Sequence, residues 1–170
     1  MPWYGSHSFL NNYIHENKSK RILEVGVLKG ENAKTMVEVA INNFPPEEVE
    51  YYGFDFFGGS RYHQVKRKLK KTGCKIRLFK GNTVNTLPEA VKTLPKMDLI
   101  FIDGGKSYVE AKSDWEESKR LMYEKTAVFI HNYEFSGVQK MVDSIPRDEY
   151  QVKIIHVSHD ANTAMIKKNV

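Results

Sequence analysis

The alternation of short apolar runs with helical patterns is the feature that most constrains how this chain folds. Strand-like runs lie at 21–25, 50–54, 75–79, 98–102, 126–130, 150–157 and 163–167. Helical patterns separate the first five runs and follow the fifth, near 31–43, 61–72, 87–94, 108–123 and 137–145. Strands that alternate with helices predict a parallel sheet with right-handed crossovers. The last two runs are joined by the polar "SHDAN" without a helix, which predicts an antiparallel hairpin at the sheet edge.

The expected fold is therefore an α/β, Rossmann-like doubly wound sheet of five parallel strands with a C-terminal antiparallel hairpin. Capping-box spelling predicts three helix starts, at Thr86 with Glu89, Ser107 with Glu110, and Ser136 with Gln139. The run "DLIFI" has no polar alternation, which is typical of a strand covered on both faces. A chain of 170 residues is expected to form a single domain over 1–170.

Composition excludes several classes of protein. Hydrophobic residues make up 41% of the chain and charged residues 28%, as in globular proteins. The single cysteine, Cys74, excludes an internal disulfide and favours a reducing compartment. No basic stretch followed by an apolar core opens the sequence, and nowhere do apolar residues run long enough to span a membrane. We expect a cytoplasmic protein with no membrane partner.

The net charge of +5 is concentrated in the segment 61–77, "RYHQVKRKLKKTGCKIR". This segment has two interpretations. It is either a phosphate-binding patch for nucleic acid or the solvated face of an amphipathic helix, with Val65 and Leu69 directed inward. Only Tyr62 interleaves with the lysines, whereas stacking on single strands needs more aromatic residues. The solvated face is favoured, and nucleic acid is not an expected partner.

The first strand ends in "LEVGVLKGENA", where Gly26 and Gly30 allow the backbone to pass close to a ligand. The dinucleotide pattern G-x-G-x-x-G is absent, because Leu28 and Glu31 occupy its other glycine positions. This disfavours a nicotinamide oxidoreductase. Glu24 would repel a pyrophosphate and suits a cationic ligand group.

Polar residues also follow the next four strands, at the edge where ligands bind in open α/β sheets. Asp55 is placed to accept hydrogen bonds from ribose hydroxyls, and Phe56 to cover an adenine face. The remaining candidates at these strand ends are Asn82, Thr83, Asp103, Lys106, His131 and Asn132. The other histidines, including His7, show no metal-ligand spacing, and His159 with Asp160 is interpreted as a turn.

The segments "LEVGVLKG", "GFD", "KGNT", "DLIFIDGGKSY" and "AVFIHNYEFSGV" together resemble those of class I S-adenosylmethionine-dependent methyltransferases, over roughly residues 20–145. The resemblance implies a seven-stranded sheet and S-adenosylmethionine as cofactor. It also implies cofactor-binding roles: Glu24, Gly26 and Gly30 for the methionine part, Asp55 for the ribose, Asn82 and Thr83 for the adenine. Phe56 and Asp103 complete the expected cofactor site.

The segments expected to form the catalytic end of the site resemble two different branches of that superfamily. "DGGKSY" resembles the element of the catechol and caffeoyl-CoA type O-methyltransferases, in which Asp binds a divalent metal and Lys helps to deprotonate the acceptor hydroxyl. "HNYEFSGV" resembles the His-Asp-Tyr element of a broader branch of small O-methyltransferase-like proteins. His131 stands where the first branch has Asp, and Asn132 where the second has Asp. Metal candidates are therefore Asp103, His131 and Asn132, and a metal is possible but not favoured.

We expect an O-methyltransferase with Asp103 and Lys106 as catalytic residues. The alternative interpretation of Lys106 is a solvated loop residue that pairs with Asp103. The alternative function is a binding module that has lost turnover and contacts nucleic acid through 61–77. The acceptor is a small or a larger hydroxylated molecule, and because no inserted lid is visible, a homo-oligomer is possible.

Overall fold

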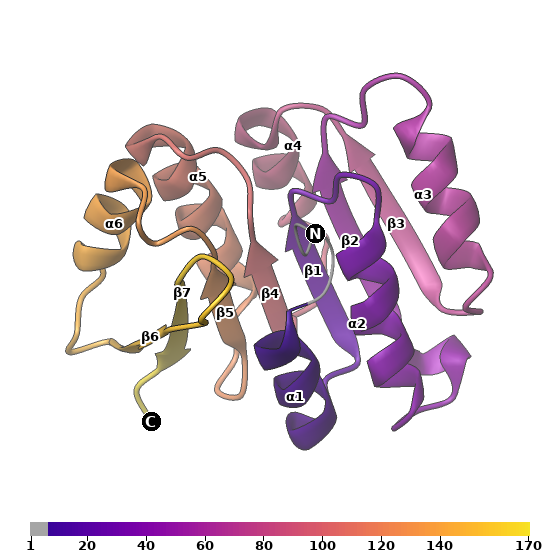
Figure 1. Cartoon of the computed structure of the whole chain (residues 1–170), viewed down its shortest axis with the longest axis horizontal. Coiled ribbons are helices and arrows are strands. Elements are labelled where there is room, and N and C mark those ends of the chain that lie inside the picture. Colours follow the sequence, from indigo (N-terminus) through magenta and orange to yellow (C-terminus); the bar gives the residue numbers. More distant parts are fainter. Residues whose placement is uncertain (1–6) are drawn as a thin grey trace.

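The computed structural model describes residues 7–170, and a single seven-stranded sheet runs through them. The strand order is β3-β2-β1-β4-β5-β7-β6 (Figure 1). The strands are β1 (Arg21–Val25), β2 (Glu50–Asp55), β3 (Lys75–Lys80), β4 (Leu99–Ile102), β5 (Ala127–Ile130), β6 (Tyr150–Ile155) and β7 (Thr163–Lys168). β1 to β5 pair in parallel, and β7 pairs antiparallel with both β5 and β6. The predicted doubly wound sheet with a C-terminal antiparallel hairpin is confirmed, with β7 inserted between β5 and β6.

Helices cover both faces of the sheet. One face packs against α1 (Ser8–Asn17), α2 (Glu31–Ile41) and α3 (Arg61–Lys70), and the other against α4 (Thr83–Ala90), α5 (Tyr108–Ser118) and α6 (Ser136–Asp143). Two short 3-10 turns, η1 (Pro46–Glu48) and η2 (Lys119–Leu121), complete the regular elements of residues 7–170. β4 and β5 are buried at every residue, as their unalternated apolar sequences predict.

The order of strands reverses at β1, which has β2 on one side and β4 on the other. At such a switch point the loops that follow the two strands turn to opposite faces of the sheet and leave a crevice between them. The carboxyl ends of β1 to β4 all lie at the upper edge of the sheet in Figure 1. The candidate residues of the strand ends therefore share one edge.

Helix starts differ from the prediction in two places. α4 begins at Thr83 rather than near 87, because the Asn82 side chain caps it by accepting a hydrogen bond from Val84 N at 3.1 Å. α6 starts after Phe135 without a side-chain cap. The predicted capping boxes at Thr86 and Ser136 are wrong. The third box is confirmed, since Ser107 and Glu110 cap α5 reciprocally.

The pattern near the N-terminus does not predict α1, which nevertheless forms a full helix. Leu10 and Ile14, four residues apart, are completely buried against the sheet. Lys18 ends the helix in the left-handed conformation with φ of 50°. Phe9 and Tyr13 of the same helix are partly buried against the same apolar cluster, so tertiary burial rather than local propensity stabilises α1.

The basic helix α3 buries Val65 and Leu69, as predicted, and its remaining residues are exposed or half-buried. Lys68 has a structural role, because its Nζ donates to the carbonyl of Lys29 at 2.8 Å and also pairs with Glu31. Lys66 lies over the ring of Tyr62 at 5.7 Å. Two of the positively charged side chains of α3 therefore make contacts within the protein. Among the described residues, no helix is long and apolar enough to cross a membrane.

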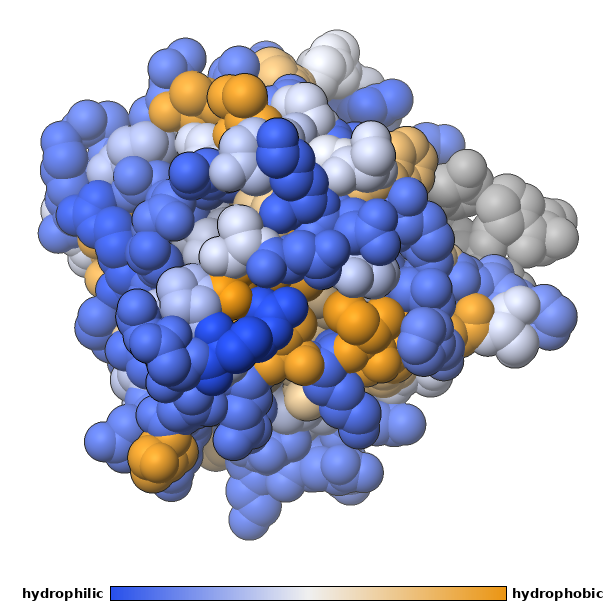
Figure 2. Space-filling view, turned by 90° about the vertical axis from the view of Figure 1, so that its left-hand side faces the viewer, coloured by the Kyte–Doolittle hydropathy of each residue, from blue (hydrophilic) through white to orange (hydrophobic). Residues whose placement is uncertain are grey.

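Seen from the side of α5, α6 and β6, the surface is mostly hydrophilic, with apolar side chains visible between charged ones (Figure 2). A shallow groove of about 250 Å³ runs there between α5, α6 and the start of β6, with Trp115 and Tyr150 among its lining residues. Tyr108, which begins α5 two residues after Lys106, is also among its lining residues.

Candidate functional site

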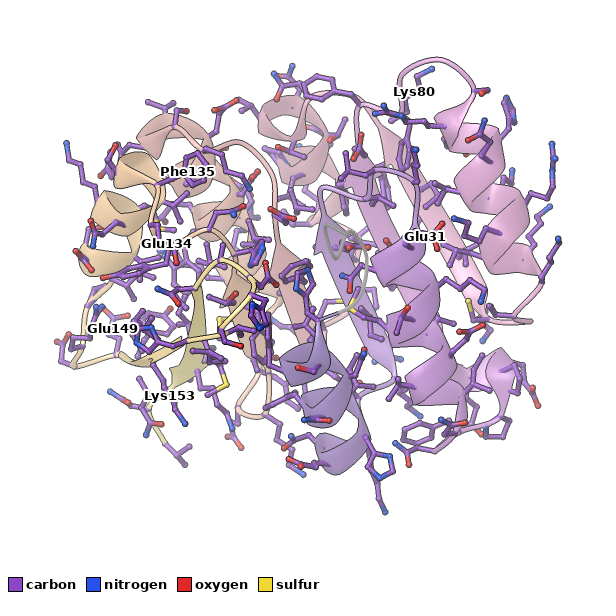
Figure 3. The ribbon with its side chains drawn as sticks, in the orientation of Figure 1. Glu31, Lys80, Glu134, Phe135, Glu149 and Lys153 are labelled. Carbon is purple, nitrogen blue, oxygen red and sulfur yellow. The ribbon has the colours of Figure 1, made fainter. Side chains whose placement is uncertain are left out.

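Exposed large apolar side chains gather at the edge formed by the carboxyl ends of the parallel strands. Each loop or first helical turn that follows β1 to β5 presents one of them: Leu28, Phe56, Val84, Val109 and Phe135, which are 40 to 72% exposed. Phe135, after β5, and Lys80, at the end of β3, lie at opposite ends of this edge (Figure 3). Apolar groups beside polar ones are typical of a site for an organic ligand.

Gly26 brings the ends of β1 and β4 into close contact. Its φ is +89°, and an added Cβ would lie 2.1 Å from the carbonyl oxygen of Asp103. Only glycine fits there, because both the conformation and the space exclude a side chain. Gly30, with φ of +76°, precedes α2 and stands against Val65. The structure therefore assigns Gly26 a packing role in shaping the crevice.

Asp55 fastens the loop that follows β1. Its Oδ2 accepts hydrogen bonds from the backbone N–H groups of Val27 at 2.8 Å and Leu28 at 2.9 Å, and its Oδ1 accepts from Phe57 N at 3.0 Å. A carboxylate has about four lone-pair sites, so one remains for a ligand hydroxyl. The neighbouring Phe56 is 65% exposed, so its ring is accessible for stacking against a planar ligand group.

Glu24 is buried within β1 rather than exposed at the edge of the sheet. Its side chain is 1% exposed, and it accepts hydrogen bonds from the Tyr51 hydroxyl and, at 2.9 Å, from Asn32 Nδ2. Burial raises the pKa of Glu24 to about 8, which the two hydrogen bonds only partly offset. Glu24 therefore connects β1 to the first turn of α2 through Asn32, and direct contact with the cofactor stays a prediction. The amide oxygen of Asn32 is buried without a hydrogen-bond partner among the described residues.

The loop after β3 and helix α5 bring a further acid into the site. Asn82 uses its side chain to cap α4, and Thr83 follows it at the start of that helix. Asp114 of α5 is fully buried, and neither of its oxygens makes a hydrogen bond within the described residues. Burial raises its pKa to about 6. Asp114 lies three residues after Ala111 and four before Ser118, on the buried face of α5. This helical spacing is the sequence feature that could have indicated its burial.

Asp103 and Lys106 meet as the sequence predicts. Lys106 Nζ lies 2.5 Å from Asp103 Oδ1, and the two side chains are 32% and 26% exposed. The backbone of Lys106 is fixed by Gly137 of α6, where a Cβ would lie 2.5 Å from the Lys106 carbonyl oxygen. This close packing holds a solvent-accessible ion pair beside the crevice.

The three metal candidates do not form an oxygen-rich site. His131 is 6% exposed; its Nδ1 lies 2.8 Å from Thr163 Oγ1 and its Nε2 lies 3.3 Å from Asp160 Oδ1. Burial lowers the pKa of His131 below its usual value. Asn132 follows with φ of +60°. Magnesium requires near-octahedral oxygen ligands, so Asp103, His131 and Asn132 do not fit it.

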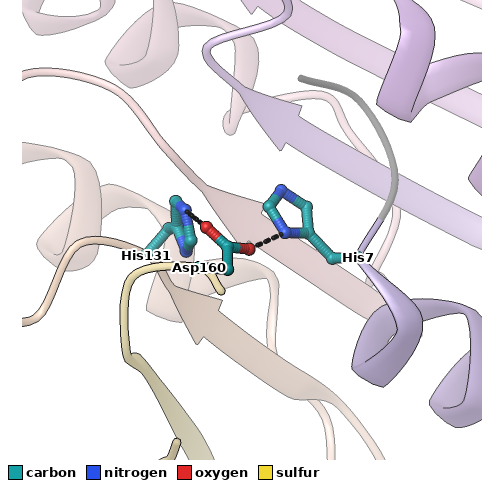
Figure 4. A group of neighbouring side chains, drawn as sticks. All are labelled: His7, His131 and Asp160. Carbon is teal, nitrogen blue, oxygen red and sulfur yellow. Dashed lines mark hydrogen bonds and ion pairs between the residues drawn. The ribbon is translucent and has the colours of Figure 1, made fainter. Parts of the chain in front are cut away.

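His131 instead joins two residues that the sequence did not indicate as ligands. Its partners are His7, before α1, and Asp160, in the β6–β7 loop (Figure 4). His7 Nδ1 lies 2.7 Å from Asp160 Oδ2. No spacing rule detects this cluster, since 153 residues separate His7 from Asp160.

The strand order β3-β2-β1-β4-β5-β7-β6 and the antiparallel β7 define a Rossmann-like methyltransferase fold. A family model described as a methyltransferase domain matches residues 23–133, and the chain belongs to this family. No curated protein matches the sequence.

Solved structures share the fold at low identity. The O-methyltransferase TomG from Streptomyces achromogenes, in complex with S-adenosylmethionine, has a TM-score of 0.79 at 14% identity over 95% of this chain and 78% of that chain. An O-methyltransferase from Bacillus cereus, in complex with S-adenosylhomocysteine, has a TM-score of 0.77 at 13% identity over 95% and 79%. The S-adenosylhomocysteine-bound methyltransferase PaMTH1 from Podospora anserina has 0.75 at 16% over 96% and 77%.

Proposed function

We propose that this protein is an S-adenosylmethionine-dependent methyltransferase that acts on a hydroxyl group. The observation that carries the proposal is the edge of the sheet, where the loop or first helical turn after each of β1 to β5 presents an exposed apolar side chain, and where Asp55 and Asp103 supply polar groups. Membership of the methyltransferase-domain family supports it. When bound, S-adenosylmethionine supplies an electrophilic methyl group on a sulfonium.

The residues at this edge suit the parts of that cofactor. The free acceptor site of Asp55 suits a ribose hydroxyl, and the exposed ring of Phe56 suits an adenine face. Asn82 and Thr83 are proposed to contact the base, and the loop between Gly26 and Gly30 the methionine part. Asn32, with its unpartnered buried oxygen, adds a hydrogen-bond acceptor beneath that loop.

The reacting end is proposed to lie at Asp103 and Lys106. Methyl transfer to oxygen requires the acceptor to be aligned with the methyl carbon and to lose its proton as it attacks. The Lys106 ammonium, held by the Asp103 carboxylate, stabilises the negative charge that develops on the acceptor oxygen, and the Asp103 carboxylate accepts the hydroxyl proton. No step in this proposal requires magnesium.

Ligand-dependent stability tests cofactor binding. S-adenosylhomocysteine at about 100 times its dissociation constant should add about 2.7 kcal/mol, seen as a rise of several degrees in melting temperature. NAD is the matched control and should produce no shift. Absence of a shift at millimolar S-adenosylhomocysteine would contradict the proposal.

Turnover needs a separate measurement. Transfer of a labelled methyl group from S-adenosylmethionine is followed across a panel of hydroxylated acceptors, small and macromolecular. Product formation supports the O-methyltransferase. Cofactor binding without transfer to any acceptor would favour the alternative, a binding module that has lost turnover.

A further inference from the structure

We infer that His7, His131 and Asp160 form a binding site for a transition-metal ion of the zinc class, independent of the proposed methyl transfer. Each residue offers one ligand atom, and these atoms lie within 4.8 Å of one another. The three come from the segment before α1, the loop directly after β5 and the β6–β7 loop (Figure 4). The folded chain alone brings them together.

The separations are close to those that a bound ion requires. Zinc binds imidazole nitrogen and carboxylate oxygen at about 2.0 to 2.2 Å, so tetrahedral ligands stand about 3.3 Å apart. Asp160 lies 2.7 Å from His7 Nδ1 and 3.3 Å from His131 Nε2. Shifts of less than about 1 Å per ligand would admit the ion, which replaces the two contacts to Asp160.

The ligand types select the metal. Two imidazole nitrogens and one carboxylate suit zinc, iron, cobalt or nickel, whereas magnesium and calcium prefer oxygen ligands. Among the described residues, no fourth His, Cys, Asp or Glu completes the cluster. Three protein ligands leave a coordination position for water or a ligand oxygen, as in catalytic zinc sites.

Groups around the cluster orient its ligands. Thr163 Oγ1 lies 2.8 Å from His131 Nδ1, which leaves Nε2 directed at Asp160. Oδ1 of Asp160 accepts a hydrogen bond from Ala161 N at 2.8 Å. Such outer partners fix ring and carboxylate orientation in metal sites.

The surroundings of the cluster are dry. His7 is 8% exposed and His131 6% exposed. The Phe101 ring lies against both imidazoles, with its centroid 5.2 Å from that of His7 and 5.8 Å from that of His131. A low-dielectric shell strengthens the attraction between a cation and the carboxylate of Asp160. Asp160, 24% exposed, provides the opening to solvent.

Metal titration of the full chain, without a histidine tag and after treatment with chelator, tests the inference. Calorimetry with Zn²⁺ should give one ion per chain, and Co²⁺ should develop visible absorption bands of tetrahedral or five-coordinate geometry. Asp160→Asn keeps the size of the side chain and should weaken binding by about a hundredfold or more. Thr163→Val should weaken it by about 10- to 100-fold through loss of the outer hydrogen bond.

The matched control is His159→Ala, which removes an exposed imidazole from the same loop and should leave affinity unchanged. Far-UV circular dichroism checks that each variant is folded, and His7→Gln replaces any variant that is not. The inference is overturned if the unaltered chain takes up neither ion saturably. It is equally overturned if folded Asp160→Asn and Thr163→Val bind like the unaltered protein.

Discussion

Oδ2 of Asp55 lies 2.9 Å from the backbone nitrogen of Leu28, so the end of β2 holds the loop that follows β1. The same carboxylate accepts hydrogen bonds from Val27 and Phe57. A residue chosen from the sequence as a ribose ligand is therefore also part of the scaffold of its own site. Its substitution should affect both stability and ligand binding.

We expect Asp55→Ala to lower the free energy of unfolding of the unliganded protein by about 1 to 3 kcal/mol, because three backbone N–H groups lose their acceptor. The melting-temperature rise with S-adenosylhomocysteine should also disappear. Chemical denaturation and thermal shift measure the two effects. Glu38→Ala, which removes only an exposed ion pair with Lys34, is the control and should change stability by less than about 0.5 kcal/mol. Unchanged ligand binding by Asp55→Ala would exclude Asp55 from the cofactor site.

Replacement of Lys106 by Ala should lower the rate of methyl transfer by about a hundredfold, the usual scale for loss of a group that stabilises the charge developing in the transition state. Affinity for S-adenosylhomocysteine should not change, which separates a catalytic role from a cofactor-binding one. Lys112→Ala removes an exposed lysine of the adjacent helix and should leave the rate unaltered. Equal rates for Lys106→Ala and the unaltered enzyme would leave Lys106 as a solvated partner of Asp103.

The stability of the fold should depend on pH through Glu24, whose pKa burial raises to about 8. The folded state favours the protonated acid, so the stabilisation is complete below the unfolded pKa near 4.5 and is lost as pH rises toward 8. Glu24→Gln mimics the protonated form. As pH rises across this range, the unfolding free energy of the unaltered protein should fall relative to that of Glu24→Gln, by up to about 1.4 kcal/mol per pH unit. Denaturation of both proteins between pH 5 and pH 8 measures it, and a constant difference would refute the assignment.

Substitution of Gly26 by Ala should destabilise the protein by at least about 2 kcal/mol, because its φ is +89° and the new Cβ would lie 2.1 Å from a backbone oxygen. Gly58→Ala offers the matched comparison, since an added Cβ there meets nothing within 4 Å. Equilibrium denaturation should separate the two variants clearly. Similar midpoints would show that the ends of β1 and β4 can move apart without loss of stability.

Replacement of Lys66, Lys70 and Lys71 by Gln should leave S-adenosylhomocysteine affinity unchanged, because α3 projects these side chains away from its buried face. Lys68 is left in place, since it bonds to the loop after β1. Binding of RNA and DNA is measured in parallel at several salt concentrations. Micromolar affinity that falls in the variant, with a flatter salt dependence, would overturn the solvated-face interpretation.

The sequence alone determined the layered sheet and the edge at which the site lies. Apolar runs such as 98–102 have the period and composition of buried strands, and these features can be recognised from the local sequence without knowledge of the tertiary contacts. Helix boundaries were less certain, because Asn82 and Thr86 are both acceptable caps and only the packed helix selects Asn82. α1 has a weak local pattern and depends on burial of Leu10 and Ile14 against the sheet.

Only the tertiary structure decided what the candidate side chains face. Glu24 follows a strand pattern that predicts its position, yet its neighbours Tyr51 and Asn32 come from other elements and hold its carboxylate in the buried interior. His7, His131 and Asp160 form a cluster because β7 inserts beside β5 and carries the β6–β7 loop to the end of that strand. Local sequence fixes the direction of the backbone, whereas contacts between distant segments depend on how whole elements pack.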